Sequence, residues 1–304
     1  MFQETIERAP LTILLGYQPK VQHQPWPGKQ DDLDPHPVDI YLPAENGGKE
    51  LYKAAGKLKG KNVIITGGDS GIGRATTIMY SMEGAANILI VYLPQEEEDA
   101  QNTKKDAEKY GAKVHTLALD ISKRENCKKV AETALKEFGH VHILVNNAAV
   151  QMVRANIEEL PEDQWDLTFA TNIHPYFYLS KYIVPQMKYG DSIINCASVN
   201  AYIGRPDLLD YTSTKGAIVA FTRGLSNQYC NKGIRCNAIC PGPVWTPLVP
   251  STMSTEAIEQ FTSPIGRPSQ PSEIATCFVF LASSDSSSIT GQSLHPNGGV
   301  IVNG

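Results

Sequence analysis

The chain has 304 residues, of which 41% are hydrophobic and 19% charged, with a formal net charge of -5 at pH 7. This length is enough for one large α/β domain and an additional segment. A modestly acidic chain lacks the basic face that nucleic-acid binding normally needs, so no nucleic-acid partner is expected. The longest apolar run near the start, 11–15, is far too short to span a membrane, and Glu4 and Glu7 argue against a transit peptide. We therefore expect a cytoplasmic protein without membrane contact.

The six cysteines show no Cys-x-x-Cys pair and no neighbouring histidine cluster. They are Cys127, Cys196, Cys230, Cys236, Cys240 and Cys277. Buried, reduced thiols are therefore expected in place of disulfides or zinc, and no metal site is predicted.

Residues 1–55 differ in composition from the rest, since they hold seven of the 20 prolines and few periodic apolar positions. This composition is typical of extended or disordered backbone. Two interpretations stay open: a disordered leader, or an extension in which Trp26, Ile40, Tyr41 and Leu42 anchor across a neighbouring subunit. We favour the second, because apolar anchors spaced by prolines bind at a low ordering cost.

From residue 56 to 304, expected strands and helices alternate, which predicts one α/β domain with a parallel sheet and right-handed crossovers. The expected strands are 63–65, 87–92, 113–119, 141–145, 193–197, 234–239 and a last one over 289–294. The expected helices are 75–83, 96–110, 124–138, 161–172, 175–188, 211–231 and 271–282.

A glycine-rich turn follows the first of these strands. The run is Thr66-Gly67-Gly68-Asp69-Ser70-Gly71-Ile72-Gly73-Arg74. A strand, a glycine turn and a helix N-terminus form an anion site, because unpaired N–H groups and the helix dipole converge where backbone can approach a phosphate. The spacing G-x-x-x-G-x-G differs from the dinucleotide fingerprint G-x-G-x-x-G. Its position between a strand and a helix nevertheless favours a phosphate site.

Tyr211 and Lys215 stand one helical turn apart on the expected helix 211–231, with Ser198 thirteen residues before the tyrosine. Positions i and i+4 share a helix face, so the Lys215 ammonium can stabilise a phenolate. It would lower the tyrosine pKa from about 10 toward neutrality. Because a general acid/base works best with a pKa near the working pH, the trio predicts proton transfer to a carbonyl oxygen.

Together these residues resemble the short-chain dehydrogenase/reductase family, from about Leu58 to the C-terminus. Three further motifs match in order. Asn146-Asn147-Ala148-Ala149 is similar to the family's Asn-Asn-Ala-Gly, with Ala149 replacing glycine; Asn172 falls at its catalytic asparagine; and Pro241-Gly242 is similar to its Pro-Gly beside the nicotinamide. The chain resembles most a tail-bearing group that includes glucose and ribitol dehydrogenase homologues.

The resemblance implies a Rossmann-like doubly wound parallel sheet flanked by helices, with a Pro-rich N-terminal extension. It also implies an NAD(P)(H)-dependent oxidoreductase that interconverts a carbonyl, in a ketone, aldehyde or sugar, and its alcohol. Tyr211 would be the general acid/base, with Ser198 on the carbonyl oxygen. Lys215 would stabilise the phenolate and hold the ribose hydroxyls, and Asn172 would keep a water in line to Lys215.

Cofactor and substrate residues also follow from the resemblance. The dinucleotide is expected to contact Gly67, Ser70, Gly71, Ile72, Gly73, Tyr92, Asp120, Ile121, Asn147, Ala148, Tyr211, Lys215, Pro241, Gly242, Val244 and Thr246. The substrate is expected to contact Gln151, Asn200, Tyr202, Trp245 and the segment 246–265.

The type of dinucleotide depends on the residue after the second strand, where NAD sites carry an acid. That position is Tyr92 or Leu93, which is neutral, and Ser70 replaces a frequent base of the family, leaving Arg74 as the motif's only cation. The acidic run 96–98 would disfavour a phosphate if it faced it. Because the decisive acid is missing, NADP(H) is favoured over NAD(H).

A non-redox isomerase or dehydratase, or a nucleotide-binding structural protein, is the alternative function on this fold. The complete set of Asn172, Ser198, Tyr211 and Lys215 argues against both. Family enzymes usually form dimers or tetramers, and the apolar C-terminal segment 289–302 would be partly exposed in a lone subunit. We therefore expect a homotetramer.

Overall fold

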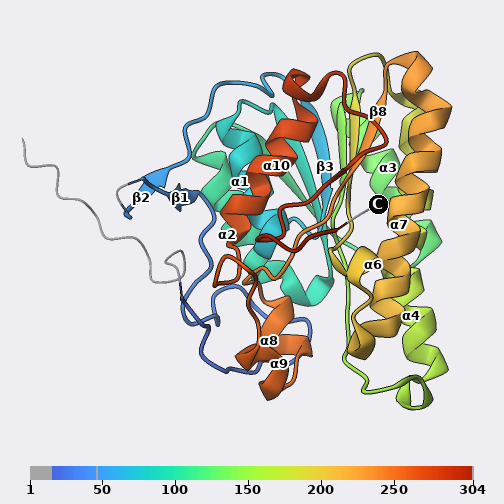
Figure 1. Cartoon of the computed structure of the whole chain (residues 1–304). Coiled ribbons are helices and arrows are strands. Elements are labelled where there is room, and N and C mark those ends of the chain that lie inside the picture. The colour runs from blue at the N-terminus through green and yellow to red at the C-terminus, as the bar shows by residue number, and fades with distance from the viewer. Residues whose placement is uncertain (1–15, 46, 303–304) are drawn as a thin grey trace, which may run out of the picture.

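A parallel sheet with helices on both faces forms the body of the protein (Figure 1). The computed structural model describes residues 16–45 and 47–302. Its seven-stranded sheet has the order β5-β4-β3-β6-β7-β8-β9, and all neighbouring strands are parallel. The strands are β3 (Asn62–Thr66), β4 (Asn87–Tyr92), β5 (Lys113–Ala118), β6 (Ile143–Asn146), β7 (Ser192–Cys196), β8 (Arg235–Ile239) and β9 (Ser293–Leu294). The predicted doubly wound, Rossmann-like sheet is confirmed.

Helices cover the two faces because each strand is apolar on both sides. The helices are α1 (Gly71–Met82), α2 (Glu97–Glu108), α3 (Arg124–Phe138), α4 (Glu162–Asn172), α5 (His174–Ile183), α6 (Asn200–Ile203), α7 (Leu209–Tyr229), α8 (Leu248–Thr252), α9 (Thr255–Glu259) and α10 (Pro271–Ala282). Alternate side chains of β3 enter different layers: Val63 and Ile65 pack with α1, α2 and α10, whereas Ile64 packs with α3 and α5.

The strand order reverses between β3 and β6. The chain first builds outward from β3 through β4 to β5 and then returns to place β6 on the other side of β3. In open α/β sheets, such a switch point opens a crevice outside the carboxyl ends of the strands. The fold therefore fixes where a ligand site can form.

Most predicted elements are close to the observed ones. The strand 87–92 and the helices 124–138 and 271–282 have the predicted limits, whereas the expected strand 289–294 shrinks to Ser293–Leu294. The short helices α6, α8 and α9 and the hairpin of β1 (Tyr41–Pro43) with β2 (Lys49–Leu51) were not predicted. Elements this short carry too few residues for a periodic pattern.

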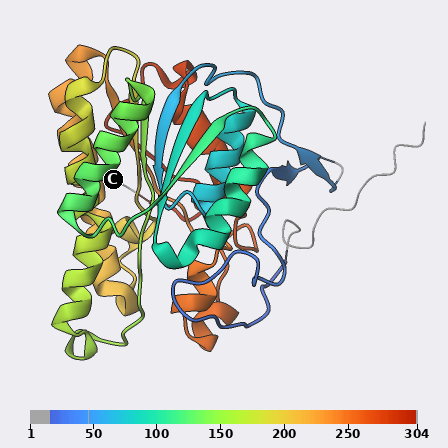
Figure 2. The same cartoon turned by 180° about the vertical axis from the view of Figure 1, so that it is seen from behind.

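The described part of the N-terminal extension packs on its own chain. In both views it runs beside α8 and α9 (Figures 1 and 2). Leu33 is 2% exposed and packs in one apolar cluster with Trp245, Val249 and Phe261. The Trp245 indole N–H donates a hydrogen bond to the Pro35 carbonyl (2.8 Å). The apolar run 11–15, with Glu4 and Glu7, lies outside the described residues.

All six cysteines are unpaired. Cys230 departs from the expected burial and is exposed, because it follows the last turn of α7. Within 16–45 and 47–302, no helix is long and apolar enough to cross a membrane, and no group of three or more His, Cys, Asp or Glu side chains could hold a metal ion.

The burial of Leu33 gives a test of the docked extension. Leu33→Ala should lower the free energy of unfolding by about 2–4 kcal/mol, because it leaves a cavity in an apolar cluster. Urea unfolding would measure this, with Leu51→Ala as the control, because Leu51 lies in the same N-terminal region but is 44% exposed. Equal, small effects of both substitutions would contradict the docked arrangement.

Candidate active site

A cavity of about 670 Å³ opens at the carboxyl ends of the central strands. One lining residue ends or follows each of five strands: Gly67 after β3, Tyr92 at the end of β4, Asn147 after β6, Ser198 after β7 and Pro241 after β8. This is the crevice expected from the reversed strand order, and it is large enough for a ligand of drug size or more.

The glycine-rich turn brings backbone against backbone beside this cavity. Gly67 has φ +62°, and a Cβ atom on Gly73 would lie only 1.7 Å from the Gly67 carbonyl oxygen. Any side chain at residue 73 would therefore push the turn away from α1. The N–H groups of Ile72 and Gly73 donate to no acceptor within the described residues. Two free donors at a helix N-terminus fit a pyrophosphate.

The loop after β6 is clamped to the same turn. The Asn147 side-chain amide donates to the carbonyls of Thr66 and Gly67, at 3.1 Å each. The Thr66 hydroxyl accepts from the backbone N–H groups of Asn147 (2.9 Å) and Ala148 (3.1 Å). These bonds hold the floor of the cavity rigid where the ribose of a dinucleotide would lie.

Ser198, Tyr211 and Lys215 meet at the opposite part of the cavity. Helix α7 carries the tyrosine and the lysine on one face, and the loop after β7 carries the serine. The Lys215 Nζ lies 5.2 Å from the centre of the Tyr211 ring and donates to the Cys196 carbonyl (2.8 Å). All three side chains are almost fully buried.

Burial dominates the ionisation of Tyr211 and Lys215. It raises the pKa of the Tyr211 phenol above its usual value, and the hydrogen bond with Ser198 acts in the opposite direction. Burial also lowers the pKa of the Lys215 ammonium. The expectation that Lys215 draws the tyrosine pKa toward neutrality is therefore not met in this structure. The physical reason is the loss of hydration, which disfavours the charged form of both groups.

Asn172 lies behind the cavity and does not line it. Its Oδ1 accepts from the Val150 N–H (2.8 Å), and its Nδ2 donates to the Val150 carbonyl (2.8 Å) and the Thr214 hydroxyl (3.2 Å). The side chain is thus fully used in joining the loop after β6 to α7. It thereby ties that loop to the turn of α7 that carries Tyr211, and the expected role of Asn172 in keeping a water in line to Lys215 stays a prediction.

Carboxyl groups gather at another part of the cavity, Asp69 from the turn after β3 and Glu96 and Asp99 from the segment after β4. Asp69 and Glu96 line it, and Asp99 is buried beside them. Burial raises the pKa of Asp69 to about 7 and that of Glu96 to about 8, and the charge of Asp69 adds to the shift of Glu96. Among the described residues, Arg205 and Lys215 are the cations that line the cavity. Asn200 and Ser198 also line it.

Comparison with known proteins matches residues 67–301 to the family model described as enoyl-(acyl carrier protein) reductase. An uncharacterized oxidoreductase of Schizosaccharomyces pombe is 50% identical over 94% of this chain and 98% of the relative. A solved short-chain dehydrogenase/reductase of Serratia marcescens superposes with a TM-score of 0.75 at 30% identity, covering 80% of this chain and 98% of that one. The chain belongs to the short-chain dehydrogenase/reductase family.

Two further relatives have named activities. The glucose and ribitol dehydrogenase of Daucus carota is 45% identical over 95% of this chain and 99% of the relative. The chloroplastic NADPH-dependent aldehyde reductase 1 of Arabidopsis thaliana is 48% identical over 83% of this chain and 90% of the relative. The resemblance to the glucose and ribitol dehydrogenase group is thereby confirmed, and the protein is an oxidoreductase of this family.

The family's cofactor positions surround the cavity, with Gly73 behind its wall. Those that line it are Gly67, Ser70, Gly71, Ile72, Tyr92, Asp120, Ile121, Asn147, Ala148, Tyr211, Lys215, Pro241, Gly242, Val244 and Thr246. Asp120 is not the N-cap of α3, a role that falls to Lys123. Its Oδ1 accepts from the Ser122 N–H (2.9 Å).

Of the expected substrate residues, Gln151 and Asn200 line the cavity, whereas Tyr202 and Trp245 do not. The Tyr202 hydroxyl donates to Ser293 (2.8 Å), and its ring packs on His295. Trp245 is fully buried and holds the extension through Pro35. Both predictions are corrected, because Tyr202 packs against His295 outside the cavity and Trp245 packs behind its wall, in the cluster that contains Leu33 and Val249.

The sequence missed several lining residues. They include Trp26 and Pro27 of the extension and Asp69, Glu96, Leu167, Ile203, Arg205 and Val300. The predicted substrate segment 246–265 does line the cavity, through residues that include Leu248, Val249, Met253 and Phe261. Nothing in the sequence placed Trp26 beside a cavity built more than 40 residues later.

Proposed function

We propose that this oxidoreductase interconverts an aldehyde or ketone with an apolar substituent and its alcohol, with Tyr211 as general acid/base. The observation that carries the proposal is that the Ser198 and Tyr211 side chains share one cavity with the free N–H donors of the glycine-rich turn. A carbonyl group and a dinucleotide can thus occupy the same enclosed space. No specific observation favours a non-redox reaction or a structural role.

The residues divide the chemistry between them. A bound nicotinamide dinucleotide supplies or accepts the hydride at the carbonyl carbon. Tyr211 gives its phenolic proton to the carbonyl oxygen, and Ser198 donates a hydrogen bond to the same oxygen as negative charge develops there. The raised pKa keeps the phenol protonated before reaction. The Lys215 ammonium, against the ring, then stabilises the phenolate that remains.

The dinucleotide would lie along the sheet edge. Ile72 and Gly73 offer their N–H groups to the pyrophosphate, and Lys215 reaches the nicotinamide ribose. Asp120 and Ile121 contact the adenine, and Asn147 with Ala148 backs the ribose. The segment 241–246 supports the nicotinamide.

The substrate end of the cavity supports a partly apolar carbonyl compound. Leu167, Ile203, Leu248, Met253 and Phe261 form most of its wall, with Gln151, Asn200 and Arg205 as polar members. A polyol would leave several hydroxyl groups without partners on such a wall, which costs affinity. Among the named activities of the relatives, that of an aldehyde reductase fits this wall better than that of a sugar dehydrogenase.

The preference between NADP(H) and NAD(H) depends on the carboxyl groups of Asp69 and Glu96. The neutral Tyr92 and Leu93 favoured NADP(H), and the NADPH-dependent relative supports it. Asp69 and Glu96 argue against a 2′-phosphate when they are ionised. Their raised pKa values reconcile the two, because both groups carry protons below neutral pH. We therefore propose that NADP(H) competes well with NAD(H) only where these carboxyls are protonated.

A homotetramer in the cytoplasm completes the proposal. A groove of about 470 Å³ between α5 and α7 is lined by Phe177, Val184, Phe221 and Leu225, and Phe177 is 48% exposed in the single chain. Exposed apolar residues that border a groove are typical of a subunit interface. Ile301 near the C-terminus is also exposed, which supports a second contact surface.

Tyr211→Phe should reduce kcat for carbonyl reduction by roughly 10²–10⁴-fold, because the ring still packs but its proton is gone. Dinucleotide affinity, measured by fluorescence titration, should stay near that of the wild type. Tyr202→Phe is the matched control, since its hydroxyl bonds Ser293 outside the cavity, and it should keep its activity. Near wild-type reduction by Tyr211→Phe would remove the proposed mechanism.

The ratio of the dissociation constants for NADPH and NADH should rise with pH between about 6.5 and 8.5, as Asp69 and Glu96 lose their protons and repel a 2′-phosphate. Glu96→Gln should remove most of this rise. Glu132→Gln is the control, because Glu132 pairs with Lys128 on the exposed face of α3. A ratio that is flat with pH in the wild type would contradict the role of these carboxyls.

Light scattering should give the mass of a tetramer for the full chain. Phe177→Glu should shift the mass toward smaller species, because a charge in the α5–α7 groove disfavours a buried apolar contact. Tyr189→Glu is the control, because Tyr189 is 88% exposed and lies outside the groove. A monomeric wild type would refute the assembly.

A further inference from the structure

One glutamine of the N-terminal extension reaches the glycine-rich turn. Gln30 is only 4% exposed, and its Oε1 accepts a hydrogen bond from the Gly71 N–H (3.0 Å), the first of α1. Its own backbone N–H donates to the Asp99 carboxylate of α2 (2.9 Å). Gln30 therefore joins the turn that faces the pyrophosphate to the helix that follows β4.

This contact replaces an ordinary helix cap. Ser70, the residue before α1, makes no capping hydrogen bond with its side chain. The Gly71 N–H is satisfied from outside the helix by Gln30, whereas the next two N–H groups, of Ile72 and Gly73, find no acceptor in 16–45 or 47–302. Because Gln30 occupies the Gly71 N–H, the N–H groups of Ile72 and Gly73 are the ones left for a ligand.

The same segment is fixed on the substrate side. Trp26 and Pro27 line the cavity, and the Ser251 hydroxyl of α8 donates to the Pro27 carbonyl (3.1 Å). Gly28 has φ +84°, and a Cβ atom there would lie 2.6 Å from the Pro247 carbonyl oxygen. Only a glycine allows the extension to lie this close to the start of α8.

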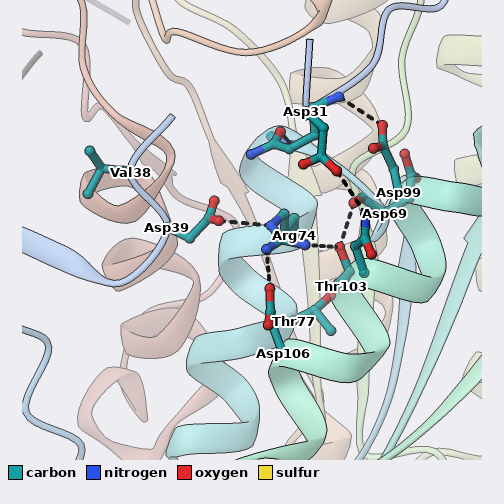
Figure 3. A network of polar contacts seen from close by, with 12 residues as sticks. Asp31, Val38, Asp39, Asp69, Arg74, Thr77, Asp99, Thr103 and Asp106 are labelled. Carbon is teal, nitrogen blue, oxygen red and sulfur yellow. Dashed lines mark hydrogen bonds and ion pairs between the residues drawn. The ribbon is translucent and has the colours of Figure 1, made fainter. Parts of the chain in front are cut away.

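On the other side, the extension is fixed by polar contacts with α1 and α2 (Figure 3). Asn102 donates to Asp31 (2.9 Å), and Lys29 pairs with Glu98 (2.9 Å). Arg74 of α1 donates to Asp39 of the extension (2.8 Å) and to Asp106 of α2. Residues 24–39, which we call the strap, therefore connect α8 on the substrate side of the cavity to α1 and α2 on the cofactor side.

We propose that Gln30 is a positioning residue of the dinucleotide site and that the strap belongs to that site in its own subunit. This rests on the dinucleotide binding set out under the proposed function. A neutral amide suits the place, because it caps Gly71 without adding charge beside a pyrophosphate. A carboxylate could accept the same hydrogen bond and would favour the helix dipole, yet it would repel the ligand.

This difference makes Gln30→Glu the decisive variant. It keeps the acceptor for the Gly71 N–H and nearly the same shape. Because burial beside Asp99 should raise the pKa of a carboxyl at this position, the melting temperature should stay close to that of the wild type near about pH 6, and the charge should develop as the pH rises toward about 9. The dissociation constant for NADH relative to that of the wild type, measured by fluorescence titration, should therefore rise roughly tenfold or more at about pH 9, because the new charge lies beside the N–H groups proposed to bind the pyrophosphate. The dissociation constant for adenosine, which has no phosphate, should change far less.

Two further variants complete the experiment. Gln30→Met removes the acceptor without adding charge and should weaken NADH binding by a smaller factor than Gln30→Glu. Gln22→Glu is the matched control, since Gln22 lies on the same extension and bonds the backbone of Asp34 away from the turn. It should bind NADH as the wild type does.

The outcomes separate this inference from the function it rests on. Wild-type NADH affinity in Gln30→Glu at about pH 9 would overturn the role of Gln30. So would equal losses of affinity for NADH and adenosine, accompanied by a lower melting temperature, since these describe a structural role alone. A wild-type protein that binds neither NADH nor NADPH would overturn the proposed function itself before the variants are compared.

Discussion

The backbone of Gly73 lies against the carbonyl of Gly67 so closely that a Cβ atom would stand 1.7 Å from that oxygen. This close approach seats the N-terminus of α1 on the end of β3, with the Ile72 and Gly73 N–H groups unpaired. Thr66 and Asn147 lock the loop after β6 to the same turn. The glycines therefore let α1 approach the end of β3, and the side chains of Thr66 and Asn147 hold the end of β6 beside it.

Loss of hydration governs the chemistry at both ends of that cavity. At one end it keeps the Tyr211 phenol protonated and makes the Lys215 ammonium a costly charge that needs the Cys196 carbonyl. At the other end it raises the pKa values of Asp69 and Glu96 toward neutrality. In the proposed mechanism, the same loss of hydration prepares a proton donor for a carbonyl and makes the preference between NADP(H) and NAD(H) depend on pH.

The N-terminal extension forms part of the wall of the cavity, through Trp26 and Pro27. Leu33 and Trp245 anchor it in an apolar cluster with α8 and α9, and Gln30 reaches through to α1. The loop after β8 is long and holds only short helices, so it gains rigidity from contacts outside itself. The N-terminal extension therefore contacts both the substrate wall and the glycine-rich turn and connects them.

Local patterns in the sequence determined the strands, most helices, the glycine-rich turn and the Ser198, Tyr211 and Lys215 trio, because each depends on near neighbours or on motif order. Tertiary structure decided the rest. Tyr202 and Trp245 pack outside the predicted substrate wall. Trp26, Glu96 and Asp69, which come from separate segments, line the cavity. Such placements depend on contacts between residues far apart in the chain, and no local periodicity records them.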